Sequence, residues 1–301
     1  MELRHFRYFI AVAEEGSVTL AAERRLHTSQ PSLSRQLRDL EYEIGVDLFV
    51  RSAQGVSLTP AGKVFLEGAR LAMAQIEAAV EAARRAAHPE KPSFAVGFLT
   101  GQEMDWLPGA MSLLKDEMPN LEITVSSQYS PDLAEALRRR KLDAAFMRPE
   151  RDMGDLAYLP LTREPLDVIM PSDHALAARE TVPIAMLESE TFINVSQTAP
   201  ALRLVIDRYL ADSGAAIRTD HEVDNIAMAM SLVASTRGVA LLPAYVENFM
   251  PWSVTSRPLE GEPPTIELVV GYHPANESAT LKLFLSRVGD LAASVAKKPR
   301  H

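Results

Sequence analysis

Polar side chains between residues 30 and 38 have the types and the spacing needed to bind nucleic acid. The stretch carries apolar residues at helical spacing, namely Leu33, Leu37 and Leu40, which predicts a helix with one buried face. Four polar residues would then point outward: Gln30, Ser34, Arg35 and Arg38. Arginine and glutamine can each make two hydrogen bonds to the edge of one base, and arginine also binds phosphates. This face is a candidate DNA-binding surface, and the alternative is the solvated face of an ordinary helical hairpin.

A second helical pattern precedes this stretch. Over residues 18–26, the small Ala21 and Ala22 would let another helix approach closely. The break at residues 27–29 ends with Ser29, which is placed to cap the next helix, and Pro31 stands in the first turn, where a proline costs no hydrogen bond. Two helices joined by a tight turn are typical of a helix-turn-helix.

A second candidate site consists of polar residues that follow predicted strands in the C-terminal part of the chain. These residues are Thr100, Gly101, Gln102, Ser130, Arg148 and Ser196. Hydroxyl groups, backbone N–H groups at helix N-termini and one arginine suit a small carboxylate ligand. The alternative for Arg148 is a structural salt bridge with one of the acidic residues that follow it, Glu150, Asp152 or Asp155.

The composition describes an ordinary globular protein of 301 residues, 47% hydrophobic and 24% charged, which is long enough for two domains. No run approaches the ~20 apolar residues of a membrane span. Charges also interrupt the N-terminal apolar pattern where a signal peptide would have none. Without cysteine, the chain can form neither disulfides nor thiolate metal sites. We therefore expect a cytoplasmic protein with no membrane contact.

The net charge of −9 gives no support to nucleic-acid binding. Residues 1–88 contain equal numbers of basic and acidic side chains, so the acidic excess falls on residues 89–301. Phosphate binding by the N-terminal part would therefore depend on where individual arginines lie, namely Arg24, Arg25, Arg35, Arg38 and Arg51.

The elements around the two helices predict a winged helix-turn-helix domain over residues 1–58. A first helix is expected from Leu3 to Glu15, with Gly16 as its stop. After the third helix, two β-prone runs at 48–51 and 56–58 flank a turn and predict a hairpin. In this wing, Arg51 would contact the DNA backbone or the minor groove, and the alternative is a surface arginine.

One long helix is expected after the wing. Thr59 and Pro60 form a cap and first-turn pair, and only two glycines interrupt the helical pattern before His88. About 28 residues give a helix of roughly 42 Å, which a small wing domain cannot cover along its length. The apolar stripe predicts self-pairing into a dimer, and the alternative is a rigid spacer. Residues 59–88 form this linker helix, and residues 89–92 form a hinge.

Residues 93–301 alternate between predicted strands and helices, which is typical of an α/β fold. Two sets of these elements predict two lobes, lobe I at about 93–162 with 267–301 and lobe II at about 163–266. Each lobe would be built on a largely parallel sheet with right-handed crossovers. Ligands of such sheets bind beyond the carboxyl ends of the strands. We therefore expect the carboxylate site in the cleft between the lobes.

Two other classes of protein explain the chain less well. A solute-binding module accounts for residues 93–301 but leaves residues 1–88 without a purpose. An enzyme would need a catalytic motif, and the sequence has no GxGxxG, GxxxxGK[ST], HExxH or GxSxG. The seven histidines are scattered, and the adjacent Ser172, Asp173 and His174 cannot form a triad without an unusual turn. We expect no metal and no cofactor.

The N-terminal sequence is similar to the signature of LysR-type transcriptional regulators. The similar segments are MELRHFRYFIAVAEEGS, AAERRLHTSQPSLSRQLRDLE, IGVDLF and LTPAGKVFL, and LDAAFMR and GVALLPAY are similar to the effector domain of the family. The resemblance implies a winged helix-turn-helix, a long dimerising linker helix and a two-lobed, periplasmic-binding-protein-like effector domain. Within the family, the chain most resembles regulators of aromatic-acid catabolism, including those of phenylpropionate and cinnamate dioxygenases.

The resemblance also implies a function and its residues. A LysR-type regulator binds double-stranded promoter DNA as a homodimer or homotetramer, acts with RNA polymerase, and changes its DNA contacts when a small-molecule effector binds. Carried over to this sequence, the groove contacts fall on Gln30, Pro31, Ser34 and Arg35, with Arg51 in the wing. The positions that line the effector cleft are Thr100, Gly101, Ser130, Arg148 and Ser196.

The second helix departs from the family pattern. Most members have two residues between the alanine pair and the leucine that closes this helix, whereas this chain has three, Glu23, Arg24 and Arg25. In a regular α-helix, an extra residue turns everything beyond it by ~100°. The family pattern therefore does not fix where Leu26 and the two arginines point.

Overall fold

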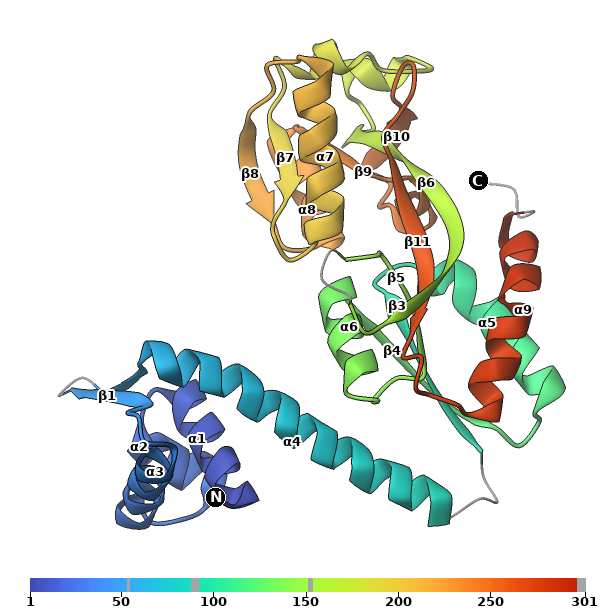
Figure 1. The fold of residues 1–301 in the computed structure, drawn as a ribbon. Coiled ribbons are helices and arrows are strands. Elements are labelled where there is room, and N and C mark those ends of the chain that lie inside the picture. Colours follow the sequence, from blue (N-terminus) through green and yellow to red (C-terminus); the bar gives the residue numbers. More distant parts are fainter. Residues whose placement is uncertain (53–54, 88–91, 151–153, 297–301) are drawn as a thin grey trace. The chain divides into compact units, whose positions relative to one another are not determined.

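The computed structural model describes residues 1–52, 55–87, 92–150 and 154–296. These residues form two compact units, Met1–His88 and Pro89–His301, which Figure 1 draws as ribbons. The expected hinge at 89–92 lies outside the described residues except for Pro92. Each unit has hydrophobic clusters of its own, so each can fold around its own apolar side chains.

The first unit consists of short helices, a hairpin and one long helix. Its elements are α1 (Leu3–Glu15), α2 (Val18–Leu20), the π-helical segment η1 (Ala21–Leu26), α3 (Gln30–Ile44), β1 (Phe49–Ser52), β2 (Gly55–Leu58) and α4 (Pro60–Ala87). The helix ends follow the sequence signals. Ser17 and Ser29 each accept a hydrogen bond from the first turn that they cap. Gly16 ends α1 with a left-handed φ of 62°, which a residue without Cβ adopts freely.

The first unit has a single core that α1, α3, the hairpin and α4 share. Its most buried large side chains are Phe9, Leu33, Leu37, Leu40 and Leu48. Phe65 of α4 packs against Phe9 of α1, with ring centroids 4.9 Å apart in an edge-on arrangement. β1 and β2 pair antiparallel. Three helices followed by a two-stranded wing form a winged helix-turn-helix.

The second helix is not the regular α-helix that the pattern predicts. Residues 18–20 are α-helical, but Ala21–Leu26 form a π-helix, in which N–H groups bond to carbonyls five residues back. The N–H of His27 bonds to the carbonyl of Ala22, and His27 ends the segment with a left-handed φ of 46°. The wider turn absorbs the extra residue. Ala21 and Ala22 are therefore fully buried, and Leu26 packs against the same core.

The long helix α4 spans 28 residues, as the sequence predicts. Ala69 and Met73 face the core of the first unit and are buried. Other large apolar side chains of α4 have no cover within this unit: Val64 is 73% exposed, Leu71 53% and Val80 45%. Exposed apolar side chains repeated along one helix are a surface that association would bury.

The second unit is built on a nine-stranded sheet in the order β4-β3-β5-β11-β6-β9-β7-β8, with β10 beside β6. Its strands are β3 (Ser93–Leu99), β4 (Glu122–Gln128), β5 (Ala144–Met147), β6 (Ala157–Pro171), β7 (Phe192–Val195), β8 (Thr219–Val223), β9 (Val239–Pro243), β10 (Val254–Pro258) and β11 (Thr265–Tyr272). Its helices are α5 (Glu103–Glu117), α6 (Ser130–Arg138), α7 (Pro200–Ser213), α8 (Ile226–Thr236) and α9 (Ala279–Ala296). Short 3₁₀ turns are η2 (Ala175–Ala178), η3 (Ile184–Leu187) and η4 (Ala244–Phe249).

The sheet is mixed, so the prediction of a largely parallel sheet was wrong. β3 runs parallel to β4 and β5, and β7 runs parallel to β8 and β9. In contrast, β11 is antiparallel to β5 and β6, and β6 is antiparallel to β9 and β10. β6 pairs with β11 through residues 157–165 and with the strands of the other lobe through residues 166–171. The long strands β6 and β11 thus connect the two lobes (Figure 1).

Lobe I has helices on both faces of its sheet. Ala144 and Phe146 of β5 join a cluster with side chains of α5 and α9, while the alternate residues Ala145 and Met147 join a cluster with α6. This alternation is the two-residue period of a strand. Phe146 stacks on Phe98 of β3 with centroids 4.7 Å apart. The paired cores hold the carboxyl ends of β3, β4 and β5 in place.

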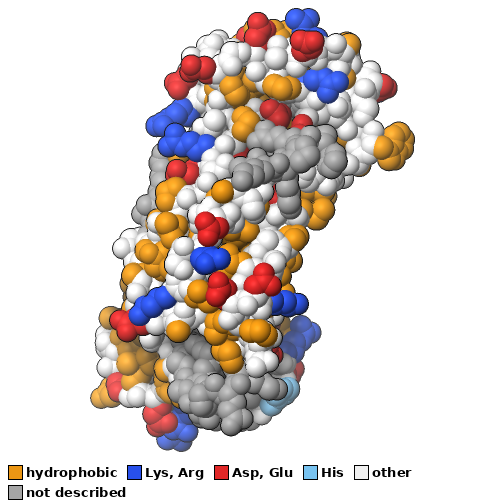
Figure 2. All heavy atoms as spheres, turned by 90° about the vertical axis from the view of Figure 1, so that its right-hand side faces the viewer, with side chains coloured by type: hydrophobic (Ala, Val, Ile, Leu, Met, Phe, Trp, Pro, Cys, Tyr) orange, Lys and Arg blue, Asp and Glu red, His pale blue; other side chains and the backbone are white. Residues whose placement is uncertain are grey.

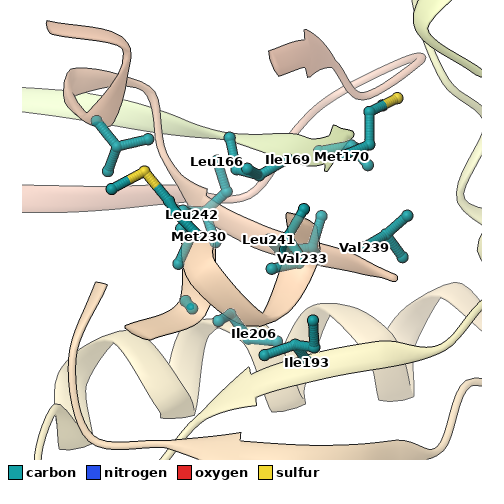
Figure 3. Packing of buried hydrophobic residues seen from close by; sticks show 14 of the residues in the cluster. Leu166, Ile169, Met170, Ile193, Ile206, Met230, Val233, Val239, Leu241 and Leu242 are labelled. Atoms are coloured by element: carbon teal, nitrogen blue, oxygen red, sulfur yellow. The ribbon is translucent and has the colours of Figure 1, made fainter. Parts of the chain in front are cut away.

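Lobe II buries a second core between its strands and the helices α7 and α8. Figure 3 shows side chains of β6, β7 and β9 lying between these helices and the sheet. The labelled members are all buried: Leu166, Ile169, Met170, Ile193, Ile206, Met230, Val233, Val239, Leu241 and Leu242. Each lobe thus has a core of its own, and β6 and β11 run between the lobes.

Charged side chains are spread over the surface. On the face that Figure 2 shows, acidic and basic side chains are interspersed with apolar ones over the coloured atoms. The acidic excess does not gather into one patch there. Among the residues that the structure describes, no helix has the length and apolar character that crossing a membrane requires.

Candidate functional site

The outer face of α3 presents the polar residues that the sequence places there. Gln30, Pro31, Arg35 and Arg38 are exposed, and Ser34 is half-buried. Gln30 Nε2 donates to Ser34 Oγ at 3.0 Å, and Arg38 Nε donates to the carbonyl of Ser34 at 3.3 Å. The Arg35 side chain is 81% exposed, with Nε 4.0 Å from Asp39. Its guanidinium therefore keeps its hydrogen-bonding capacity for an external partner.

The arginines of the π-helical segment differ from each other. Arg25 Nη1 lies 2.5 Å from the carboxylate of Glu14, and its Nε lies 3.4 Å from Glu15. Arg70 of α4 donates to the other oxygen of Glu14 at 2.7 Å. The hydrogen bonds from Arg25 and then Arg70 lower the pKa of Glu14. Both arginines of the segment, Arg24 and Arg25, are exposed, and Arg25 is ion-paired within its own unit.

The wing residue Arg51 is placed only by its backbone. Arg51 pairs with Val56 across the hairpin, which puts it on the wing that the sequence predicts. Its side chain lies outside the described part of the structure.

A cavity of about 400 Å³ lies between the two lobes of the second unit. Lobe I contributes the ends of its strands and the start of α6, and lobe II contributes η4 and the start of α8. Four of the predicted residues line it: Thr100, Gly101, Ser130 and Arg148. Its apolar wall includes Met104, Leu202, Ile226 and Phe249. The volume and the mixture of apolar wall and few polar groups are typical of a small-molecule site.

Arg148 is the buried cation of this cavity. Its side chain is 4% exposed and forms an ion pair through Nη2 with Glu164 of β6. Its backbone N–H donates to Ser130 Oγ at 2.9 Å, and its guanidinium lies 5.7 Å from the ring centroid of Tyr245. Among the described residues, Nη1 has no hydrogen-bond partner. A buried guanidinium nitrogen without a partner is costly, and an anionic ligand would satisfy it.

Gln102 lies behind the cavity rather than on its wall. It is fully buried, its Nε2 donates to both Glu164 oxygens at 3.0 and 3.1 Å, and its Oε1 accepts from the Trp106 indole at 3.0 Å. The expected ligand contact is therefore corrected: Gln102 holds Glu164, which in turn holds Arg148. In the described part of the chain, Arg148 pairs with Glu164, and Asp155 pairs with Arg138 instead. Asp152, another expected partner of Arg148, lies outside the described residues.

Gly101 brings lobe I against two aromatic rings of lobe II. Its φ of 93° is left-handed, and a Cβ there would lie 2.9 Å from the Tyr245 ring and 2.8 Å from the Phe249 ring. Tyr245 Oη donates to the carbonyl of Thr100 at 3.1 Å. Burial raises the pKa of Tyr245, so its phenol stays protonated and can keep donating. Only glycine allows this approach.

The hydroxyl of Ser196 is bonded within lobe II. Its Oγ donates to Asp224 Oδ1 at 2.7 Å and lies 2.7 Å from the hydroxyl of Thr198. Ser196 is not among the residues that line the cavity, whereas Asp224 is. Ser196 thus fixes Asp224, and its own contact with an effector stays a prediction.

Among the described residues that line the cavity, Arg148 is the one cation, and three carboxylates line it as well. The lining residues include Glu103, Glu150 and Asp224. Glu103 accepts the N–H of Gly101 at 2.7 Å and the hydroxyl of Ser127 at 3.3 Å. Burial raises the pKa of Glu150 to about 7, so near neutral pH it is partly a neutral acid.

A larger hollow of about 790 Å³ lies between α6 and α7, but its arginines have partners. Arg138 pairs with Asp155 and Arg203 pairs with Asp207 and Glu222. Arg163 is 74% exposed and lies 3.7 Å from Glu267. The smaller cavity is the better candidate because it holds the buried cation with an unused donor.

The side chains of Ser172, Asp173 and His174 serve separate partners. Ser172 donates to the carbonyl of Trp252, Asp173 pairs with Arg237, and His174 caps η2. Each of the three side chains is thus bonded to a different partner. In the described part of the chain, no group of three metal-ligating side chains comes together.

Sequence reasoning missed several residues of the cavity. Glu164 lies inside β6 next to Pro165, where the sequence resembles a loop, and nothing local marks it as buried. Tyr245 and Phe249 come from the 3₁₀ turn η4, which has no periodic pattern. Asp224 directly precedes the cap of α8, and its place after a predicted strand is a signal that could have identified it.

Comparison with known proteins gives the family. Residues 3–63 match the family described as bacterial regulatory helix-turn-helix protein, lysR family, and residues 87–293 match the LysR substrate binding domain. The chain belongs to the LysR family. The resemblance read from the sequence is thus confirmed, as is the fold of a helix-turn-helix with a two-lobed α/β domain. The chain is a transcriptional regulator rather than an enzyme.

Relatives and solved structures agree with this family. The chain is 35% identical to the Hca operon transcriptional activator HcaR of Escherichia coli (strain K12), over 98% of this chain and 99% of that protein. It is 30% identical to the regulator AlsR of Bacillus subtilis (strain 168), over 95% and 94%. Full-length BenM has 26% identity and a TM-score of 0.60, covering 100% of both chains. CbnR, at 22% identity and a TM-score of 0.72 over 97% and 99%, shares the fold.

Proposed function

We propose that α3 binds operator DNA in the major groove and that a small carboxylate effector, bound between the lobes, alters this binding. Gln30, Pro31, Ser34 and Arg35 would meet base edges, and Arg38 and Arg51 would meet the backbone or the minor groove. The support on the DNA side is the exposed polar face of α3 and its largely free Arg35. A relative, CbnR, has been solved in complex with its target DNA.

The acting species would be a homodimer or homotetramer. The uncovered apolar side chains of α4, above all Val64 and Leu71, support pairing through this helix. Two copies related by a two-fold axis would read a pseudo-palindromic operator. Such a regulator would work in the cytoplasm, where bacterial DNA lies, and together with RNA polymerase.

The single observation that supports the effector proposal is the unpartnered Nη1 of Arg148. Its Nη1 is buried, has no partner among the described residues, and belongs to a side chain that lines the interlobe cavity. A carboxylate could accept hydrogen bonds from Nη1 and from neighbouring donors at Thr100 and Ser130. The rings of Tyr129, Tyr245 and Phe249 also line the cavity. They support an aromatic body, as does the similarity to HcaR.

The first experiment is a fluorescence-anisotropy titration of the full chain on the DNA upstream of its own gene. A scrambled duplex is the control, and each titration is repeated with a panel of aromatic carboxylates. We expect tighter binding to the upstream DNA than to the control, and a shift of that affinity by at least one carboxylate. Equal affinity for the two duplexes would sink the operator proposal for that DNA.

The effector arm uses the double variant Arg148→Met/Glu164→Gln. Arg148→Ala alone would leave the Glu164 carboxylate buried and unpaired, so loss of response could reflect misfolding. The double variant removes both charges and keeps an acceptor for Gln102. We expect it to retain operator binding and to lose the response to carboxylates. An unchanged response would show that Arg148 does not anchor the effector.

A further inference from the structure

We propose that the effector carries a carboxylate at one end and a hydrogen-bond donor, a hydroxyl or an ammonium group, at the other, and that Asp224 receives this donor. This inference rests on the proposed function and narrows the class of effector. It predicts that the regulator distinguishes hydroxylated or aminated carboxylates from unsubstituted carboxylates and from dicarboxylates.

The charges that line the cavity favour a ligand with one carboxylate. Arg148 is the only cation among the described residues that line it, and Glu103, Glu150 and Asp224 are its acids. The charge of Arg148 is already matched by Glu164. A ligand with a single carboxylate therefore enters a site whose remaining charge is negative. A second carboxylate on the ligand would meet acidic residues with no cation to balance it.

Arg148 and Asp224 lie in opposite lobes of the cavity. Arg148 is buried, 3% exposed, at the floor where β5 ends. Asp224 is exposed and follows the end of β8, at the opposite lobe. The negative charge of Asp224, after burial itself, raises the pKa of Tyr129 of lobe I, which indicates that Asp224 faces lobe I across the cavity. A ligand that fills the cavity would thus have its carboxylate at the floor and its other end near this acid.

Between Glu103 and Asp224, the hydrogen bonds favour Asp224 as the acceptor of a ligand donor. Both oxygens of Glu103 are occupied, one by the N–H of Gly101 and one by Ser127. Asp224 Oδ1 accepts from Ser196 and Thr198, which fix the side chain in place. Among the described residues, no donor bonds to its Oδ2. This oxygen is a pre-oriented acceptor, and a hydroxyl or ammonium group of a ligand is the complementary partner.

The wall between the two ends defines the body of the ligand. Met104, Leu202, Ile226 and Phe249 line the cavity between lobe I and lobe II. They offer apolar contacts and few hydrogen bonds, so the middle of the ligand should be an apolar group such as an aromatic ring. The result is a ligand with polar ends of opposite hydrogen-bonding character joined by an apolar body.

Isothermal titration calorimetry of the full chain with a matched series of ligands tests this. The probes are phenylpropanoate and its para-hydroxy, para-aminomethyl and para-carboxy derivatives. We expect the hydroxy or the aminomethyl derivative to bind on the order of tenfold tighter than phenylpropanoate, since a charged acceptor is satisfied. The para-carboxy derivative should bind weaker than phenylpropanoate. Which donor binds tighter distinguishes a phenol from an amine as the natural group.

Variants of Asp224 test whether this residue causes the preference for donor-bearing derivatives over phenylpropanoate. Asp224→Ala should reduce the affinity ratio between the donor-bearing derivatives and phenylpropanoate to about one. Asp224→Asn keeps an acceptor oxygen without the charge, so it should retain more of the preference for the hydroxy than for the aminomethyl derivative. Asp212→Ala, an exposed aspartate of α7, is the matched control and should leave both ratios at the wild-type value.

The outcomes separate this inference from the proposed function. If phenylpropanoate binds, and binding needs Arg148, but neither donor improves it, the inference fails and the effector site stands. The same holds if the para-carboxy derivative binds as tightly as phenylpropanoate, or if Asp224→Ala leaves the ratios unchanged. If none of the four compounds binds, or if binding is indifferent to Arg148→Met/Glu164→Gln, both the inference and the effector site fail.

Discussion

Arg148 and Glu164 form a buried ion pair that joins the end of β5 to the crossover strand β6. Their side chains are 4% and 9% exposed. Glu164 has a second partner in Gln102, which leaves Arg148 Nη1 as the buried polar atom without a bond among the described residues. The pair therefore does two things. It ties the end of β5 in lobe I to β6, which runs between the lobes, and it holds a cationic hydrogen-bond donor at the cavity.

The ion pair predicts an asymmetry in stability. Arg148→Met alone leaves Glu164 as a buried charge without its cation, and should lower the free energy of unfolding by about 3–5 kcal/mol. Arg148→Met/Glu164→Gln should cost clearly less, because no unpaired charge remains. Urea denaturation measures both. Arg163→Met is the control, since Arg163 is 74% exposed in its pair with Glu267 and should cost ~0–1 kcal/mol. A loss for Arg148→Met no larger than this control would contradict the buried pair.

The π-helical segment predicts that one residue of it is dispensable for folding. Deletion of Arg24 should convert Ala21–Leu26 into a regular α-helical turn and keep Ala21, Ala22 and Leu26 on the core side. We expect a melting temperature close to wild type and retained operator binding. Deletion of Asp39, an exposed residue of the regular helix α3, is the control. It turns Leu40 out of the core by ~100° and should unfold the domain. Equal damage by both deletions would show that the π turn absorbs nothing.

The sequence predicts the first unit well because its signals are local. Leucines at helical spacing, Ser17 and Ser29 as caps and Gly16 as a stop all act within a few residues, and the structure has the helices where these signals place them. The π-helix could not be predicted in the same way. The family pattern reveals an extra residue, but whether the helix rotates or widens depends on the core that Leu26 must reach.

The cavity was only partly predictable from the sequence. Some of its residues are brought there by pairing between strands that are far apart in the chain. Thr100, Ser130 and Arg148 follow strand ends, which a sequence marks as ligand positions. Glu164 is buried because β6 continues through Arg163, Glu164 and Pro165 to pair with β11. A local pattern with a proline and two charges predicts a loop there. The sequence did not predict that β6 extends over residues 157–165, where it pairs antiparallel with β11. Without this antiparallel pair, the sheet was predicted to be largely parallel.

The raised pKa of Glu150 predicts that the free energy of unfolding depends on pH. Burial raises its pKa in the folded chain to about 7 from the ordinary 4.5, so the folded state favours the protonated acid. Stability contributed by that proton is present below pH 4.5 and is lost as the pH rises through about 7. Glu150→Gln should therefore gain in melting temperature over wild type as the pH rises through this window. Exposed Glu180→Gln is the surface reference. A difference that stays flat with pH would mean that Glu150 titrates as an ordinary carboxyl.

The uncovered side chains of α4 predict how the chain associates. Leu71→Glu places a charge on a residue that is 53% exposed in the single chain, so it should not unfold the first unit. If α4 is a dimer helix, the charge would be buried on association and should shift sedimentation toward the monomer. Met228→Glu, on a residue of α8 that is 50% exposed, controls for loss of an apolar surface side chain. A wild-type sedimentation profile for Leu71→Glu would exclude this part of α4 from the interface.

Two arginines of α3 should separate base recognition from phosphate binding. Arg35 is the more exposed and has only a distant partner at 4.0 Å, so it is free to bond a base edge. Arg35→Ala should cost ~1–3 kcal/mol on the operator and little on a scrambled duplex. Arg38 uses its Nε within the helix and is placed as a phosphate contact. Arg38→Ala should weaken binding to both duplexes alike and reduce the salt slope by about one unit.

Anisotropy titrations at several salt concentrations measure both quantities for each duplex. Arg7→Ala removes an exposed arginine of α1 and controls for the loss of one positive charge from the domain. Equal weakening of both duplexes by Arg35→Ala would make Arg35 a phosphate contact. Base recognition would then have to come from Gln30 and Ser34, whose side chains are hydrogen-bonded to each other in the free chain. Gln30 and Ser34 would have to break their mutual hydrogen bond to bind a base. Gln30→Ala would then reduce the ratio of the affinities for the operator and the scrambled duplex.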